Sequence, residues 1–188
     1  PEKKNALSQA LAWGVVEAID AAAADDNVWV VALTGAGDAF CAGLDLSGSD
    51  PYSPYPEMSA QLDDIGWVGQ FVLSIRRRCD KPVVGGINGV AVGAGLGLAM
   101  ATALGRCGEV VDDAGFDARL AAYCDQLCDW SPITLRLLKR GVGKSYENEM
   151  EQQLRYEVSN IRRAFGSEDG QEARRAFLEK RKPVFTGR

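Results

Sequence analysis

The chain has 188 residues, of which 46% are hydrophobic and 25% charged, and it carries a formal net charge of −5. These values are typical of a globular domain with a substantial core, and the negative charge argues against a nucleic-acid partner, which needs a basic face. No apolar run approaches the ~20 residues of a membrane-spanning helix, and no signal-peptide pattern opens the chain. We therefore expect a cytoplasmic protein without a membrane partner.

Histidine is absent, and cysteine occurs five times. The lack of histidine excludes Ser–His and Cys–His catalytic pairs and His-ligated metals, so any acid–base chemistry falls to other side chains or to water. The odd, scattered cysteines fit free thiols in a reducing compartment. Cys124 and Cys128 stand one helical turn apart but lack the further ligands of a zinc site. We therefore expect core or interface thiols there, and no metal.

The N-terminal half predicts a helix, a strand, a turn of small residues, a loop and a second helix. The first helix ends near residues 25–27 and is indicated by apolar residues at every fourth position, Leu7, Leu11, Val15 and Ile19. Residues 28–34 are typical of a buried strand, and residues 47–56, with three prolines, of a loop. The second helix is indicated by Ile65, Val68, Val72 and Ile75, and the arginines at 76–78 suit its C-terminal turn.

The later segments turn from strand to helix. Residues 81–100 predict a strand, a turn, a short strand and the start of a Gly/Ala-rich helix. Apolar spacing then indicates helices over residues 116–127 and 150–165. Ser131, which precedes a proline, and Ser167, which precedes two acidic residues, are expected to be helix N-caps.

Two turns offer backbone N–H groups with almost no side chains around them. One lies at residues 40–43 and the other at 93–95, where a helix is expected to begin. The first turn of a helix leaves N–H groups unpaired and carries partial positive charge, so two such sites facing each other would bind a carbonyl oxygen that gains negative charge. Tight packing is the simpler explanation of each turn by itself. A dinucleotide-binding fingerprint fails, because Leu98 stands where its third glycine belongs.

The chain closely resembles the enoyl-CoA hydratase/isomerase (crotonase) family in three segments that have the family's order and spacing: PEKKNALS, GDAFCAGLDL and KPVVGGINGVAVGAGLGLAM. Its C-terminal SPITLRLLKRGV and FLEKRKPVF resemble the family's ending. The resemblance implies an α/β fold, a crotonase-like spiral of β-β-α units with a helical C-terminal trimerisation region. It divides the chain into a spiral core at 1–111 and a helical region at 112–188, and it implies a homotrimer or a hexamer.

The resemblance also implies that the substrate is an acyl-CoA thioester whose carbonyl oxygen is held by two peptide N–H groups. Carried over by position, these donors are Ala42 and Ala94. The other substrate contacts implied are Lys4, Gly43, Leu44, Asp45 and Leu46. Phe177, Lys180 and Lys182 stand where relatives approach a neighbour's CoA phosphates, although a solvated helix face explains them equally well. No separate cofactor is implied, because coenzyme A is part of the substrate.

Two features depart from the family pattern. Gly97 stands where hydratases of the family usually carry a catalytic glutamate, so hydration by two glutamates is in doubt. After Thr102 the family continues with several dozen residues, whereas Ala103 here begins a later family segment. We expect a segment to be missing between residues 102 and 103, together with a catalytic carboxylate. Asp45 and Asp64 are minor candidates for an acid or base.

Taken together, these patterns predict an acyl-CoA-processing enzyme of the enoyl-CoA hydratase/isomerase family that stabilises a thioester enolate. One alternative is a double-bond isomerase or another CoA-ester enzyme that does not hydrate, which Gly97 favours. A second alternative is an oligomer that binds CoA esters without catalysis.

Overall fold

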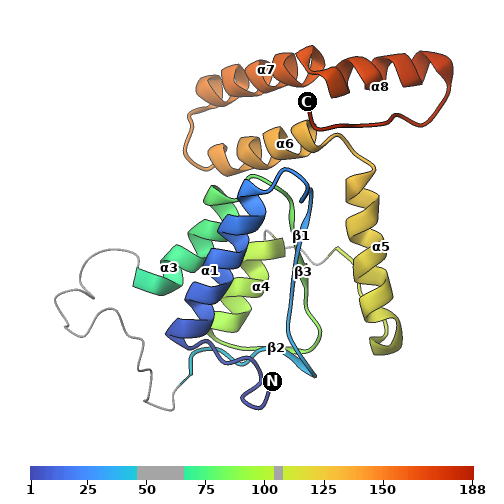
Figure 1. The fold of residues 1–188 in the computed structure, drawn as a ribbon. Helices are drawn as coiled ribbons and strands as arrows, with labels where there is room; N and C mark the ends of the chain where they lie inside the picture. The colour runs from blue at the N-terminus through green and yellow to red at the C-terminus, as the bar shows by residue number, and fades with distance from the viewer. Residues whose placement is uncertain (46–65, 104–107) are drawn as a thin grey trace.

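The computed structural model describes residues 1–45, 66–103 and 108–188 (Figure 1). Three sequence predictions therefore lie outside the described residues: the loop at 47–56 and the candidate site residues Leu46 and Asp64. Within the described ranges, every helix is too short or too polar to cross a lipid bilayer.

The strands form two parallel pairs. Each pair joins a strand of the first β-β-α unit to the corresponding strand of the second unit. The pairs are β1 (Val31–Thr34) with β3 (Val83–Gly86), and β2 (Ala39–Cys41) with β4 (Val90–Ala91). In chain order, β1 and β2 precede α3 (Gly66–Leu73), and β3 and β4 precede α4 (Ala94–Ala103). This repetition confirms the predicted spiral of β-β-α units for two units.

Helix α1 (Gln9–Ala24) follows the N-cap Ser8, whose Oγ accepts a hydrogen bond from Leu11 N (3.1 Å). The sequence predicted this helix, with Ile19 buried and Val15 packed against the core as expected, but it wrongly placed Leu11 on the buried face. A strict four-residue spacing drifts around a helix of 3.6 residues per turn. Leu11 is 41% exposed, and Leu7 lies before the helix, where it forms a β-bridge to Leu44. The residues of α1 that are buried are Gln9, Ala12, Val16 and Ile19.

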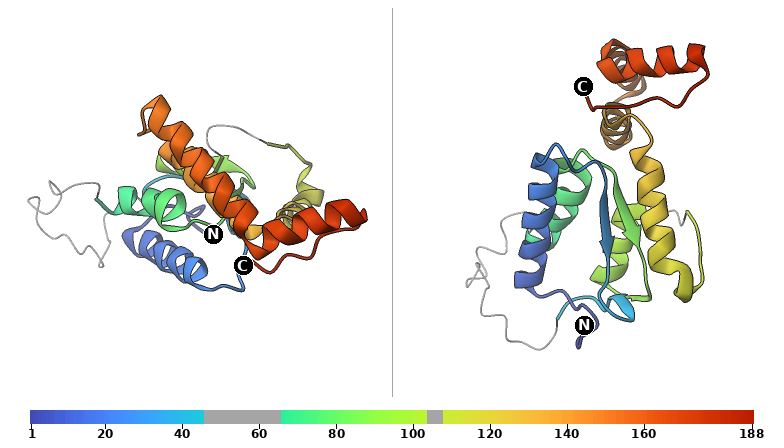
Figure 2. Two further views of the ribbon diagram at one scale, coloured as in Figure 1. Left: turned by 90° about the horizontal axis from the view of Figure 1, so that it is seen from above. Right: turned by 45° about the vertical axis from the view of Figure 1, so that its right-hand side comes forward.

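Helices cover both faces of the β1–β3 pair (Figure 2). α1, α3 and α4 lie on one face, and α5 (Phe116–Cys128) lies on the other. Successive strand residues point to opposite faces, and both helix layers approach β3 closely. A Cβ built at Gly85 would lie 2.8 Å from Thr102 Cβ of α4, and one at Gly86 would lie 2.6 Å from Leu120 Cδ2 of α5.

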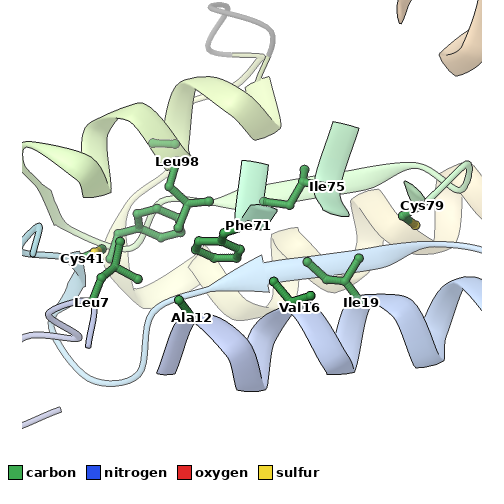
Figure 3. Close-up of a cluster of buried hydrophobic side chains, with 11 residues drawn as sticks. Leu7, Ala12, Val16, Ile19, Cys41, Phe71, Ile75, Cys79 and Leu98 are labelled. Carbon is green, nitrogen blue, oxygen red and sulfur yellow. The ribbon is translucent and has the colours of Figure 1, made fainter. Parts of the chain in front are cut away.

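The hydrophobic core lies between α1, α3 and α4 (Figure 3). A π-helical turn, η1 (Ser74–Arg78), continues α3, and the arginines at 76–78 form its last turn, as predicted. Phe71, Ile75 and Cys79 come from α3, η1 and the residue after it, and they pack with the buried face of α1 and with Leu98 of α4.

Two lysines satisfy carbonyl groups at the ends of helical segments. Lys81 has no exposed surface, and its Nζ donates to the carbonyl oxygens of Ala22 (2.6 Å) and Asp25 (2.5 Å) at the end of α1. Lys139 Nζ donates to Ile75 O and Lys81 O, both at 2.7 Å. Burial lowers the pKa of Lys139. Helix ends leave such carbonyls unpaired, and a cation near them is also favoured by the helix dipole.

The C-terminal region is helical and lies at the end of the molecule opposite the N-terminus (Figure 1). After the short η2 (Asp113–Gly115) and α5, it comprises α6 (Pro132–Lys144), α7 (Met150–Gly166) and α8 (Glu168–Glu179). The predicted N-caps are confirmed: the Oγ of Ser131 accepts from Thr134 N (3.3 Å), and that of Ser167 from Gly170 N (3.0 Å). The division of the chain at 111 stays a prediction.

Two carboxylates of α8 hold the C-terminal tail at residues 181–188. Asp169 is 1% exposed and accepts a hydrogen bond from Thr186 N (2.8 Å). Glu172 accepts two from the Arg181 guanidinium, at 2.5 and 3.0 Å. The tail is therefore fixed against α8 by charge-assisted hydrogen bonds, which are stronger than neutral ones.

Protonation of Glu172 is expected to loosen this tail. The hydrogen bonds from Arg181 and from Val184 N–H lower the pKa of Glu172 from 4.5 to about 2. Because the folded-state pKa is depressed, the stabilisation is fully present above pH 4.5 and is lost as the pH falls toward about 2. An NMR titration of the Glu172 carboxyl carbon measures this midpoint. In R181Q the midpoint should return toward 4.5; a midpoint that does not move would contradict the assignment.

Candidate active site

Pairing of β2 with β4 brings the two turns of small residues into contact. Val92 N donates to Cys41 O (3.0 Å), and α4 begins two residues later at Ala94. A Cβ built at Gly43 would lie 2.9 Å from Val92 O and 3.8 Å from Ala94 N. The turn after β2 therefore lies directly against the N-terminus of α4.

The close approach explains why the residues here are small. A Cβ at Gly95 would overlap the carbonyl oxygen of Cys41 and lie 2.8 Å from its Sγ. Gly43 and Gly93 have φ angles of +95° and +55°, in the left-handed region that side chains rarely adopt. Larger residues at Gly43 and Gly95 would push α4 away from β2, whereas at Gly93 the left-handed backbone is the constraint.

Within residues 42–45, the amide of Leu44 differs from its neighbours in its hydrogen bonding. Three amides donate within the protein: Ala42 N to Lys4 O (3.0 Å), Gly43 N to Cys41 Sγ (3.4 Å) and Asp45 N to Leu7 O (2.9 Å). In the part of the chain that the structure describes, Leu44 N makes no such bond. The Leu44 amide is thus free to bind a ligand.

This geometry corrects the donor predicted from the sequence. Ala42 was expected to supply an N–H group, but that group is held by the Lys4 carbonyl. The bridge between Leu7 and Leu44 gives the reason. In a parallel bridge the residues on either side of Leu44 bond to Leu7, so the amide of Leu44 itself points the other way. No signal in the sequence distinguishes Leu44 from Ala42, because the pairing joins segments far apart in the chain.

Ala94 supplies the second available amide. It is the first residue of α4, where N–H groups have no acceptor within the helix. The next amide, Gly95 N, turns back to Val92 O (2.9 Å), and Gly97 N bonds to Gly93 O (3.1 Å). The dipole of α4 places partial positive charge at this end. Two N–H donors, from Leu44 and Ala94, therefore stand on adjoining turns.

The surroundings of these amides are apolar. Leu44, Val92 and Leu96 are 46%, 53% and 51% exposed, so each presents about half of its surface to solvent. Gly97 is exposed, and a Cβ built there meets no atom within 4 Å. The position where hydratases were expected to carry a glutamate is therefore open space here.

The charged residues near the turn are paired with one another. Lys3 Nζ lies 2.8 Å from Asp45 Oδ2, and Lys4 Nζ lies 3.2 Å from Asp38 Oδ2. Lys4 also has a φ of +51° and holds the turn through its carbonyl. Asp45 thus has a structural partner, which fits a supporting role better than that of a general base.

Two asparagines that the sequence did not single out as site residues hold the turn in place. Asn5 Nδ2 donates to Ala36 O (2.9 Å) and Ala39 O (2.8 Å). Asn88 Oδ1 accepts from Gly35 N (3.0 Å), and its Nδ2 donates to Gly35 O (2.8 Å). Asn88 was readable as a turn residue, but its partners lie more than 50 positions away, so its role depends on the fold.

Phe177 and Lys180 do not approach the two amides within one chain. Phe177 is 83% exposed on α8, and Lys180 caps the C-terminus of α8 with a φ of 55°. Figure 1 places α8 at the opposite end of the molecule from β2. Lys182 pairs with Asp129 (2.8 Å). Any contact of these residues with substrate requires a neighbouring subunit.

The two cysteines of α5 are free thiols, with Cys124 half-buried and Cys128 exposed. The structure forms no cluster of three or more metal-ligating side chains among its described residues. The pKa of Cys124 is raised mainly by its partial burial and further by the nearby Cys128 and Asp125. The pKa of Cys128 is raised mainly by its partial burial and further by Asp125 and Asp129. A raised pKa disfavours the thiolate, which is the nucleophilic and metal-binding form.

The parallel β-β-α units, with two amides at adjoining turns, define a protein of the spiral α/β class. A sequence profile described as "Enoyl-CoA hydratase/isomerase" matches residues 1–109 and, separately, residues 103–188. The chain belongs to the enoyl-CoA hydratase/isomerase family. The two matches overlap at residues 103–109, and Thr102 and Ala103 lie together in helix α4.

Individual relatives agree with this assignment. A probable enoyl-CoA hydratase of Mycobacterium tuberculosis is 38% identical over 143 residues, which cover 76% of this chain and 52% of the relative. The 1,2-epoxyphenylacetyl-CoA isomerase of Escherichia coli is 27% identical over 248 positions, which cover 100% of this chain and 92% of the relative. A crystal structure of an enoyl-CoA hydratase from a Polaromonas species has a TM-score of 0.84 at 23% identity, covering 98% of this chain and 93% of that one, and it shows the fold. The chain spans about half the length of the first of these relatives.

Proposed function

We propose that this protein binds an acyl-CoA thioester and stabilises its enolate. The observation that carries the proposal is the pair of available amides, Leu44 N–H and Ala94 N–H, on two turns that touch each other. The thioester oxygen would accept a hydrogen bond from each. Removal of the α-proton places negative charge on that oxygen, and donors aimed at the developing charge each contribute roughly 10²- to 10³-fold in rate.

Gly97 supports a reaction other than hydration by two glutamates. Glycine cannot transfer a proton, and the space around Gly97 is open. The second candidate function is therefore double-bond isomerisation or another conversion of the CoA ester that adds no water. A binding oligomer without catalysis is the third candidate.

The partners in this proposal are the acyl-CoA ester and further copies of the chain. Coenzyme A belongs to the substrate, so no separate cofactor takes part. Self-association into a homotrimer or hexamer is supported by an apolar stripe on α7, where side chains on one helix face are 47–72% exposed: Leu154, Val158, Ile161 and Phe165. Lys4 of one subunit, with Phe177 and Lys180 of a neighbour, would contact coenzyme A.

Replacing Ala94 with proline is expected to remove one donor without breaking the helix. Proline has no N–H group but is well tolerated at the first position of a helix, which Ala94 occupies. We expect the rate of deuterium exchange at the α-carbon of butyryl-CoA, followed by NMR in D₂O, to fall about 100-fold or more in A94P.

A94S keeps the N–H group and serves as the matched control, with exchange close to that of the wild type. Equal rates in A94P and wild type would contradict the role of this amide. A wild type that binds butyryl-CoA without exchanging its α-proton would favour the third candidate. Loss of ultraviolet absorbance from the conjugated thioester of crotonyl-CoA separates hydration from the other reactions.

A further inference from the structure

A cavity of about 920 Å³ lies beside the sheet, between β3, α4, α5 and α6. Its walls are mainly apolar and include Val83 and Val84 of β3, Met100 of α4, Leu120 and Leu127 of α5, and Leu138 of α6. Pockets of about 300–1,000 Å³ with such walls are typical small-molecule sites. No residue of the turn at 42–45 contributes to it, so the cavity is separate from the two amides.

An exposed apolar stripe on α4 joins the amides to this cavity. Val92 lies just before α4 begins, and Leu96 and Met100, four residues apart, lie on one side of the helix. They are 53%, 51% and 54% exposed. The stripe begins beside Ala94 and ends at Met100, which is part of the cavity wall. Gly97 lies next to it and adds no side chain to block the way.

The charged residues that line the cavity already have partners. Arg119 donates to both carboxylate oxygens of Glu109, at 2.8 and 2.6 Å. Lys139 Nζ is bonded to two main-chain carbonyls, and Arg76 stands over the ring of Tyr146 at 5.9 Å. The cavity therefore suits an uncharged hydrocarbon group better than a free carboxylate.

The cavity also lies where this chain is shorter than its relatives. The two matches to the family profile meet at residues 103–109, and Thr102 and Glu109 both line the cavity. The alignment to the isomerase from Escherichia coli runs over 248 positions, more than the 188 residues of this chain. The part of the chain where the two matches overlap therefore borders the cavity.

We propose that the stripe and the cavity bind the hydrocarbon chain of a medium- or long-chain acyl-CoA, an inference that rests on the proposed function. Met100 is six residues beyond Ala94, or about 9 Å along the helix. A four-carbon acyl group has three carbon–carbon bonds of about 1.5 Å each, so it ends before Met100. A ten-carbon chain held at the amides reaches the cavity and buries its methylene groups there.

Isothermal titration calorimetry with decanoyl-CoA, acetyl-CoA and free coenzyme A tests the proposal. Decanoyl-CoA should bind the wild type more than tenfold more tightly than acetyl-CoA. In M100E, a carboxylate at the cavity wall should reduce this ratio toward one. M150E makes the same change at an exposed methionine at the start of α7, away from the cavity, and should keep the wild-type ratio.

The possible failures are distinguishable. Equal affinities of the wild type for decanoyl-CoA and acetyl-CoA would overturn the acyl site and leave the proposed function standing, whereas no binding of any CoA ester would overturn both. An equal loss of the ratio in M150E and M100E would show that the effect is not local, and the site would be rejected. If a second copy of the chain fills the cavity instead, M100E would weaken self-association and leave the ratio unchanged, which also rejects the site.

Discussion

G95A is expected to lower the free energy of unfolding by about 3 kcal/mol, the upper part of the range for an overpacked core. The added Cβ would overlap the Cys41 carbonyl oxygen and lie 2.8 Å from the Cys41 Sγ. That carbonyl accepts the hydrogen bond from Val92 N, so neither side can yield without breaking the contact between β2 and β4. Because the same contact holds Leu44 N–H beside Ala94 N–H, binding of acyl-CoA esters should be lost as well. Urea unfolding and calorimetry measure the two effects.

G97A is the matched control, since it makes the same change two residues further along α4. A Cβ at Gly97 meets nothing within 4 Å. Alanine is favoured over glycine in a helix by about 1 kcal/mol, so G97A should unfold at higher urea concentration than the wild type. Shifts of the same sign in G95A and G97A would show that helix propensity, and not the contact with Cys41, dominates at Gly95.

K81M is expected to lower the free energy of unfolding by about 2–4 kcal/mol, because hydrogen bonds from a charged donor contribute about 1.5–3 kcal/mol each and a buried carbonyl left alone is costly. Lys81 is fully buried and donates to Ala22 O and Asp25 O. Methionine fills a similar volume but cannot donate, so both carbonyls at the end of α1 would lose their partner. The desolvation cost of the buried ammonium group is removed at the same time, which limits the loss.

K144M tests the same substitution at an exposed site. Lys144 is 50% exposed and pairs with Glu147 (3.1 Å), and such surface pairs contribute about 0–1 kcal/mol. Its urea midpoint should stay near that of the wild type. If K81M unfolds at the same urea concentration as K144M, the two carbonyls do not depend on Lys81. A proton-exchange measurement at the amides of α1 would show whether that end of the helix frays.

Local features of this protein were predictable because their causes are local. Ser131 and Ser167 cap helices with their own hydroxyl groups, so a few neighbouring residues are sufficient to identify them. The helices and the strand before the first turn follow from apolar spacing and turn residues in the same way, whereas β2 was read as part of the turn and the β-β-α units were implied by the family resemblance. The family could be recognised because its motifs are continuous segments. The buried face of α1 was predicted only in part, with Ile19 but without Ala12 and Val16, because the packing partners decide which of two neighbouring stripes faces the core.

The sequence by itself determined most of the helices, the strands except β2, the family, and the fact that two turns must be made of small residues. Only the tertiary structure decided which amide is available. The Lys4 carbonyl holds the amide of Ala42, and the bridge to Leu7 leaves the amide of Leu44 available. Lys81 is a core residue only because the end of α1 lies over it. A backbone N–H carries no chemical label in the sequence. Its role is set by which carbonyl the folded chain places opposite it, and that is a property of contacts between distant segments.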